Sequence, residues 1–261
     1  MDDNLVWDTT LADNFKSVCK LLEIYGKEGL VMNSDKFQFG QDTVEFAGMQ
    51  VTENGVRPAR EFLESIKSFP ALTNISEVGS YFGMINQVNY AFARSDTMEP
   101  FRHLLKPGTP FLLSPILQEK FEQVKAMIIE AVTEGVRHYE VGRKTCLATD
   151  WSKHGLGFFL LQKWCNCTQM HPWCCEGGWK LVLAGGRFTT PAESRYSECL
   201  AVADALHKAK YFVLGCPDLL IATDHKPLLG MFRKPLADIQ NPRLLSLAEK
   251  TLWHSAMMGH M

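Results

Sequence analysis

The sequence has no long run of apolar residues. Its longest apolar run, Leu-Gly-Phe-Phe-Leu-Leu at 156–161, has the length of a β-strand, whereas a membrane-spanning helix needs about 20 apolar residues. Nothing near the N-terminus resembles a signal peptide, so we expect the eight cysteines to be reduced thiols. The sequence therefore predicts a protein of the cytoplasm or nucleus with no membrane partner.

The sequence also has no excess of basic residues. With 27 Lys and Arg against 29 Asp and Glu, the formal net charge is −2. A nucleic-acid partner therefore has to be met by local basic clusters or through metal ions. The hydrophobic fraction of 46% and the charged fraction of 21% are typical of a globular protein with a core.

What the sequence does contain is a repeated Ala-Thr-Asp at the end of two apolar strands, at 148–150 and 222–224. If these strands lie side by side and parallel, Asp150 and Asp224 project from the same edge of one sheet. Between them, an amphipathic helix over 197–206 carries Glu198 near its start. Three carboxylates from strand, helix and strand predict a site for Mg²⁺ or Mn²⁺.

Each acid also has a purely structural interpretation. Asp150 is a residue type that often starts a turn, and from local sequence alone the two interpretations are even. Glu198 in a first helical turn would favour the helix dipole. The second Thr-Asp, at Asp224, shifts the balance toward metal ligands.

The pattern along the chain changes near residue 140. Residues 1–60 predict a short strand at 4–7, a helix and a hairpin over 44–56, and residues 61–140 are mostly helical, with a long helix from about 117 to 133. From about residue 143 the order is strand, hairpin, strand, helix, strand, with Pro191 starting the helix. We therefore expect an α/β protein with a domain boundary near residue 140.

Several short motifs follow one another in a recognisable order. Upstream they are Lys-Phe-Gln-Phe at 36–39, Phe-Ala-Gly-Met at 46–49, Gly-Val-Arg-Pro at 55–58 and Phe-Pro-Ala at 69–71. Downstream they are Thr-Asp-Trp-Ser at 149–152, Gly-Leu-Gly-Phe at 155–158, Gly-Arg-Phe at 186–188, Pro-Ala-Glu-Ser-Arg-Tyr at 191–196 and Thr-Asp-His-Lys-Pro-Leu at 223–228. The series resembles the Pol polyprotein of gypsy-like LTR retrotransposons, from the end of the reverse transcriptase through its ribonuclease H domain.

The resemblance implies a domain organisation. Residues 1–60 would be a reverse transcriptase palm remnant and hairpin, and 61–140 the thumb and connecting helices. Residues 141–261 would be a ribonuclease H-like three-layer domain with a mixed sheet, truncated at its C-terminus.

The resemblance also implies an activity, the two-metal hydrolysis of the RNA strand in an RNA–DNA hybrid. The metal ligands would be Asp150, Glu198 and Asp224. Candidate substrate contacts are His225, Lys226 and Arg187, the last with a carboxylate as the alternative partner. The oligomeric state is not indicated.

The polymerase half is represented only by its end. Asp2 and Asp3 fall on the aspartate pair of the polymerase Tyr-x-Asp-Asp hairpin, although two acids after a methionine are ordinarily a solvated terminus. The tyrosine, the fingers and the remaining catalytic aspartate have no counterpart, so we expect no nucleotidyltransferase activity from this chain.

The sequence departs from the family in four places. About four residues are missing before Glu198, roughly one helical turn. Gly79 and Gly186 replace the family's Arg and Ser, and residues 253–261 contain no acid where the family continues through a strand to a fourth one. We therefore expect a lost edge strand and a lost metal ligand. The alternatives to a nuclease are an inactive nucleic-acid-binding or scaffold remnant and a gene fragment with no folded product.

A cysteine-rich segment lies between the second and third strands of the expected nuclease domain. Its metal-ligating residue types are Cys165, Cys167, His171, Cys174 and Cys175. Such a set can complete a tetrahedral zinc site. The spacing is not the usual paired Cys-x₂-Cys, however, and adjacent cysteines bind one ion only with strain. We therefore expect a reduced surface loop, with structural zinc as the minority hypothesis.

Overall fold

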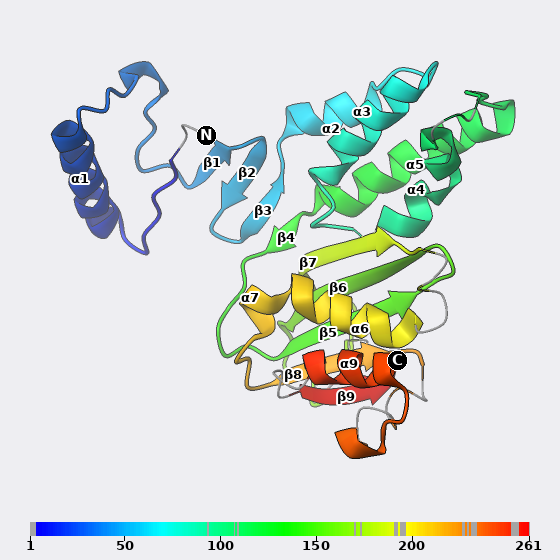
Figure 1. The fold of residues 1–261 in the computed structure, drawn as a ribbon. Coiled ribbons are helices and arrows are strands. Elements are labelled where there is room, and N and C mark those ends of the chain that lie inside the picture. Colours follow the sequence, from blue (N-terminus) through cyan, green and yellow to red (C-terminus); the bar gives the residue numbers. More distant parts are fainter. Residues whose placement is uncertain are drawn as a thin grey trace.

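The computed structural model contains two β-sheets joined by a group of helices (Figure 1). It describes residues 4–92, 94–106, 108, 110–169, 171, 172, 174–190, 193, 197–225, 228, 230, 234–251 and 256–260. Asp2, Asp3 and Lys226 lie outside these residues.

The N-terminal segment forms one helix that stands apart from both sheets (Figure 1). Helix α1 (Leu11–Glu28) begins after Thr10, whose hydroxyl accepts a hydrogen bond from the Asp13 amide, and ends at Gly29 in the left-handed conformation. A short 3₁₀ helix, η1 (Ser34–Lys36), follows. The strand expected over 4–7 does not form. A strand needs a partner, and Trp7 is 79% exposed.

The first sheet is antiparallel, in the order β1-β2-β3-β4. Its strands are β1 (Thr43–Phe46), β2 (Met49–Thr52), β3 (Gly55–Pro58) and β4 (Val136–Arg137). The first three confirm the predicted hairpin region, while β4 returns from the far end of the helical segment. The second sheet begins at Thr145, so the change of sheet falls between residues 137 and 145.

The helical segment between β3 and β4 has a core of its own. Its elements are α2 (Arg60–Lys67), α3 (Ile75–Asn86), α4 (Arg94–Arg102), η2 (His103–Leu105) and α5 (Pro115–Thr133). Helix α5 confirms the helix predicted over 117–133. Phe121 on α5 packs edge-to-face against Tyr81 and Phe101, with ring centroids 4.7 and 5.9 Å apart.

The second sheet is mixed, as predicted. Its order is β7-β6-β5-β8-β9, with β5, β6 and β7 antiparallel neighbours and with β8 parallel to both β5 and β9. The strands are β5 (Thr145–Trp151), β6 (Gly155–Lys163), β7 (Trp179–Phe188), β8 (Leu219–Thr223) and β9 (Ala256–His260).

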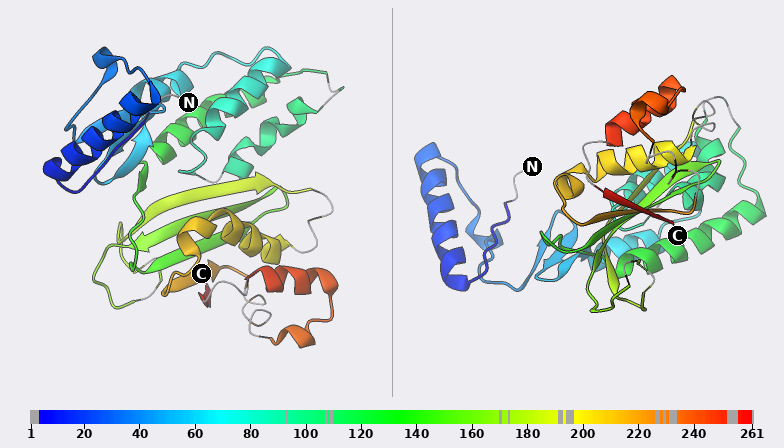
Figure 2. Two further views of the ribbon diagram at one scale, coloured as in Figure 1. Left: turned by 60° about the vertical axis from the view of Figure 1, so that its left-hand side comes forward. Right: turned by 90° about the horizontal axis from the view of Figure 1, so that it is seen from below.

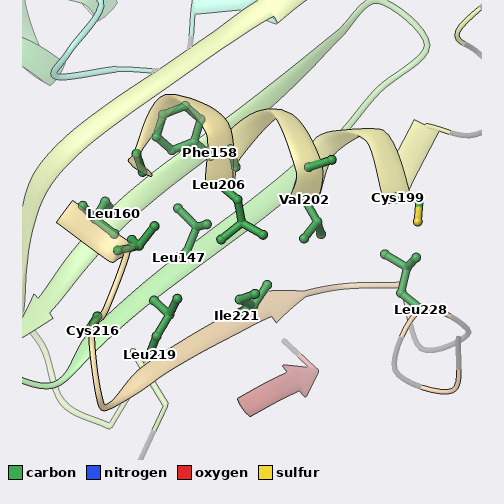
Figure 3. Close-up of a cluster of buried hydrophobic side chains, with 14 of the residues drawn as sticks. Leu147, Phe158, Leu160, Cys199, Val202, Leu206, Cys216, Leu219, Ile221 and Leu228 are labelled. Carbon is green, nitrogen blue, oxygen red and sulfur yellow. The ribbon is translucent and has the colours of Figure 1, made fainter. Parts of the chain in front are cut away.

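Helices cover one face of this sheet (Figure 2). They are α6 (Ser197–Lys208), α7 (Lys210–Val213) and α9 (Pro242–Thr251), with the 3₁₀ helix η3 (Leu236–Asp238) before α9. Leu206 and Val202 of α6 pack on Leu147 and Ile221 of the central strands (Figure 3). Helix α6 runs from Ser197, and Glu193 before it lies in a turn, whereas Pro191, the expected start of the helix, lies outside the described residues.

The expectation of a lost edge strand was wrong. Strand β9 lies parallel to β8, with Cα partners from Leu219–Ala256 to Thr223–His260. The segment was overlooked because its Ala-Met-Met-Gly-His sequence contains no β-branched residue. Pairing with the exposed edge of β8 stabilises β9 as a strand, although its own residues have little β-propensity.

The helical segment also contacts the other edge of the second sheet. The amide of Ala184 on β7 donates a hydrogen bond to the carbonyl of Tyr90. Arg102 of α4 donates to the Thr189 carbonyl at 3.3 Å, and its guanidinium lies 4.7 Å from the Phe188 ring centroid. These contacts tie the two halves together. None of the helices formed by described residues is long and apolar enough to cross a membrane.

Candidate active site at the ends of β5 and β8

Strand register brings two predicted ligands to one edge of the sheet. Thr149 of β5 and Thr223 of β8 are Cα partners in a parallel pair. The next residues, Asp150 and Asp224, therefore lie at the same level at this edge of the sheet, and both are exposed. The amide of Trp151 donates to Oδ1 of Asp150 at 2.8 Å, as expected where a strand gives way to a turn.

The third predicted ligand, Glu198, comes from the helix above this edge. Helix α6 begins at Ser197, so Glu198 lies in its first turn. The pKa of Glu198 is raised to about 7, first by burial and then by the negative charges of Asp224 and Asp150. Both aspartates thus lie within electrostatic range of Glu198, and we call these three residues the acid trio.

The acid trio is more open than a single-ion site. Among the residues that the structure describes, only a group of cysteines brings three or more ligand atoms within 4.8 Å of one another. The chemistry of the trio nevertheless suits hard divalent cations, which prefer carboxylate oxygen. The raised pKa of Glu198 marks negative charge that a bound cation would compensate.

Arg187, a candidate substrate contact, is bound to two carboxylates of its own chain. Its Nε donates to Asp204 on α6 at 2.9 Å, and its two terminal nitrogens donate to Glu193 at 3.0 and 2.8 Å. Glu193 also accepts from the amide and hydroxyl of Thr190 at 2.8 and 3.0 Å. We call Arg187, Glu193 and Asp204 the arginine network.

Glu193 and Asp204 are the residues that sequence reasoning missed. The guanidinium of Arg187 holds the pKa of Glu193 far below its usual range, at about 2, against the opposing effect of burial. Asp204 also pairs with Lys208 one turn later, at 3.1 Å. The sequence did hold a signal for this network, because an Arg at the end of a strand followed by a Glu-bearing loop favours an ion pair. Which carboxylates pair with Arg187 depends on the tertiary fold.

Of the remaining predicted site residues in the expected nuclease and polymerase sites, the structure describes His225. His225 is exposed, and its amide donates to the hydroxyl of Thr223 at 3.2 Å while its carbonyl accepts from Leu228 at 3.0 Å. His225 therefore follows β8 in a turn next to Asp224. Lys226, Asp2 and Asp3 fall outside the described residues and remain predictions.

The cysteine-rich segment forms a cluster that the sequence did not favour. The sulfur atoms of Cys165, Cys167, Cys174 and Cys175, here called the loop cysteine group, all lie within 4.8 Å of one another. His171 contributes no ligand atom to this group, and its carbonyl accepts from the Cys174 amide at 3.2 Å.

Comparison with known proteins defines the class of the second half. Residues 140–250 match the family described as the RNase H-like domain found in reverse transcriptase. The strands β5 to β8 and the covering helices α6 and α7 lie within this match, so the second half of the chain is similar to RNase H-like domains of the reverse transcriptase type.

Relatives extend the similarity over nearly the whole chain. The transposon Tf2-3 polyprotein of Schizosaccharomyces pombe is 24% identical over 246 residues, and the Tf2-7 polyprotein is 23% identical. The match covers 94% of this chain but 18% of the Tf2-3 polyprotein, so the chain spans less than a fifth of that relative. These matches confirm the resemblance to gypsy-like LTR retrotransposon polyproteins that the motifs predicted.

Solved structures share the fold. The foamy viral protease-reverse transcriptase in complex with an RNA/DNA hybrid matches with a TM-score of 0.75 at 15% identity, covering 98% of this chain and 34% of that chain. A foamy viral protease-reverse transcriptase dRH in complex with double-stranded DNA matches with a TM-score of 0.74 at 15% identity, covering 98% and 44%. At this identity the likeness shows the fold alone.

Proposed function

We propose that this chain carries the ribonuclease H of a retrotransposon reverse transcriptase and hydrolyses the RNA strand of an RNA–DNA hybrid. One observation carries the proposal. Glu198 of α6 lies in the electrostatic field of both Asp224 and Asp150, at the edge where two parallel strands end. Strand, helix and strand thus deliver three carboxylates to one place.

The roles of the acid trio follow from exposure and charge. Asp150 and Asp224 are exposed, so a phosphodiester backbone can reach them. Glu198 is half-buried and holds a proton near neutral pH, because burial and the two aspartates raise its pKa to about 7. It must release that proton to act as a ligand. Bound divalent cations would supply an activated water and charge neutralisation at the phosphate.

The arginine network positions Glu198. Arg187 connects β7 to the middle of α6 through Asp204 and to the preceding loop through Glu193. These contacts hold the middle of the helix that carries Glu198 against the end of β7.

The expected substrate is an RNA–DNA hybrid. A foamy viral protease-reverse transcriptase of the same fold was solved with such a hybrid. Because the formal net charge of this chain is −2, contacts with the backbone would depend on local basic residues and cations. Selectivity for RNA would come from groove shape and 2′-hydroxyl contacts.

A second candidate function is that of a catalytically inactive nucleic-acid-binding module. It is favoured by the open arrangement of the acid trio, whose oxygens do not converge within 4.8 Å. A module of this kind would bind the hybrid without divalent metal and leave it uncut.

Cleavage of a labelled RNA–DNA hybrid in Mn²⁺ separates the two functions. We expect the purified chain to cut the RNA strand, and Asp150→Asn and Asp224→Asn to abolish cutting. Asp238→Asn, an exposed aspartate of η3, is the matched control and should cut normally. Metal-independent binding without cleavage by the folded chain would support the inactive module instead.

A further inference from the structure

The loop cysteine group lies at the end of the sheet opposite the acid trio. The loop leaves β6 at Lys163 and enters β7 at Trp179, and these two residues are Cα partners. Asp150 pairs with Gly157, six residues before Lys163, which corresponds to about 20 Å along the strand. The two sites are therefore separate.

The spacing of the sulfurs is compatible with the size of a four-ligand metal site. All four Sγ atoms lie within 4.8 Å of one another, and those of Cys165 and Cys174 are 3.4 Å apart. Zinc bound by four thiolates at about 2.3 Å places the sulfurs about 3.8 Å from one another. The group is thus already near the required size.

The backbone of the loop holds the two pairs of cysteines together. The amide of Trp164 donates to the carbonyl of Gly178 at 2.7 Å, which extends the β6–β7 hairpin by one step. The Nζ of Lys163 donates to the carbonyls of Cys167 and of Gln169, the latter at 3.0 Å. This side chain therefore connects the loop to the end of β6.

Gly178 provides independent support. A Cβ at this position would lie 2.4 Å from Sγ of Cys175 and 2.8 Å from Sγ of Cys165. Only glycine leaves room for these two sulfurs to approach. The convergence therefore depends on a specific residue of the loop as well as on the cysteines.

The group also borders a hydrophobic surface that the helices leave uncovered. Cys174 packs against the cluster of Cys146, Ala148, Trp179 and Ala222. Cys146 and Ala148 alternate along β5 with Leu147, which packs under α6, so this cluster lies on the opposite face of the sheet. Fastening the loop would keep that face covered.

We propose that the loop cysteine group binds one zinc ion through four thiolates and that the ion fastens the β6–β7 loop over the face of the sheet opposite α6. Four sulfur ligands in tetrahedral arrangement select zinc over the hard cations expected at the acid trio. The site is structural, because four protein ligands leave no open position for substrate. Disulfide formation within the group is the competing outcome.

Metal content of the purified full chain tests the proposal. After dialysis against ZnCl₂ and then metal-free buffer, we expect one zinc per chain in the native protein and in Cys19→Ser, whose cysteine lies on α1. The Cys165→Ser/Cys174→Ser variant should retain less than a tenth of that zinc. Zinc retained by this variant, or its absence from a folded native chain, would overturn the proposal.

Two measurements on the unaltered protein guard against a variant that fails to fold. Titration with an organomercurial should release the zinc as the loop thiols react, and cobalt in place of zinc should give the intense visible absorption of a tetrahedral thiolate complex. Peptide mapping that finds disulfides within the loop cysteine group of the purified protein, or four freely reactive loop thiols with no metal released, would also overturn it.

Discussion

Arg187 at the end of β7 donates from Nε to Oδ1 of Asp204 in the middle of α6, at 2.9 Å. The contact links the edge strand on one side of the sheet to the helix that carries Glu198. Glu193 occupies the other two donors of the guanidinium, so the network holds the loop, strand and helix together. The helix that carries Glu198 is therefore held to β7 at a position six residues after that glutamate.

The first prediction concerns Glu193. Glu193→Gln should lower the free energy of unfolding by about 1–2 kcal/mol at pH 7, because it removes one of the two carboxylates that pair with the partly buried Arg187. The folded pKa of Glu193 is about 2, below its ordinary 4.5. The stabilisation is thus complete above pH 4.5 and is lost as the pH falls toward 2.

Urea unfolding at pH 7 and at pH 3 measures this effect. The difference in free energy of unfolding between the native protein and Glu193→Gln should be smaller at pH 3 than at pH 7. Glu61→Gln, an exposed glutamate of α2, is the control and should change little at either pH. Equal stability of Glu193→Gln and the native chain at pH 7 would show that the network contributes nothing.

The acid trio could be predicted from sequence because its elements are local. Two apolar strands ending in Thr-Asp and one amphipathic helix, together with the family resemblance, predict that Asp150, Glu198 and Asp224 share one edge of the sheet, and their role as metal ligands stays a prediction. Parallel pairing of β5 with β8 then aligns the strand ends. The arginine network could not be predicted in the same way, because it joins residues from a strand, a loop and a helix.

Two further features depended on contacts distant in sequence. Strand β9 is ordered by the edge of β8 and not by its own methionine-rich sequence. The loop cysteine group converges because the β6–β7 hairpin closes at Lys163 and Trp179, with Gly178 leaving space for the sulfurs. Cysteine spacing alone favoured an open loop, since spacing carries no information on hairpin closure.

The second prediction is that Glu198→Gln stabilises the metal-free protein. Burial and the two aspartates raise the folded pKa of Glu198 from 4.5 to about 7. Its ionisation therefore costs stability as the pH rises above 4.5, and the whole cost is present above pH 7. The variant should be more stable by about 1 kcal/mol at pH 8 and unchanged at pH 4.

Thermal unfolding in a chelator checks this second effect. Glu130→Gln, an exposed glutamate of α5, serves as the control. A Glu198→Gln variant that is less stable at pH 8 would mean that the glutamate makes favourable contacts in the absence of metal, against the like-charge arrangement described above.

The third prediction compares two glycines that replace family residues. A Cβ at Gly186 would lie 2.6 Å from the carbonyl oxygen of Leu156, whereas nothing lies within 4 Å of one at Gly79. Gly186→Ser should destabilise by about 1–3 kcal/mol, because β6 or β7 must shift. Gly79→Arg, on an exposed position of α3, should stabilise by up to about 1 kcal/mol.

Urea unfolding of the two variants gives the sign of each change. The comparison is informative because both substitutions restore the family residue, yet the free energy of unfolding should fall in Gly186→Ser and rise in Gly79→Arg. A neutral Gly186→Ser variant would show that the two strands adjust to a side chain without cost.

The last prediction concerns the cations of the acid trio. Binding to the folded state alone stabilises it by about 2.7 kcal/mol at 100 times the Kd. Mn²⁺ should therefore raise the melting temperature of the native protein, and a chelator of divalent ions should reverse the rise. The Asp150→Asn/Asp224→Asn double variant should show little rise, because it removes two of the three carboxylates.

Asp238→Asn, in contrast, should respond as the native chain does. Mg²⁺ and Mn²⁺ prefer oxygen ligands, so their effect should also persist in Cys165→Ser/Cys174→Ser. An equal Mn²⁺ response in the double variant would place the cation away from β5 and β8.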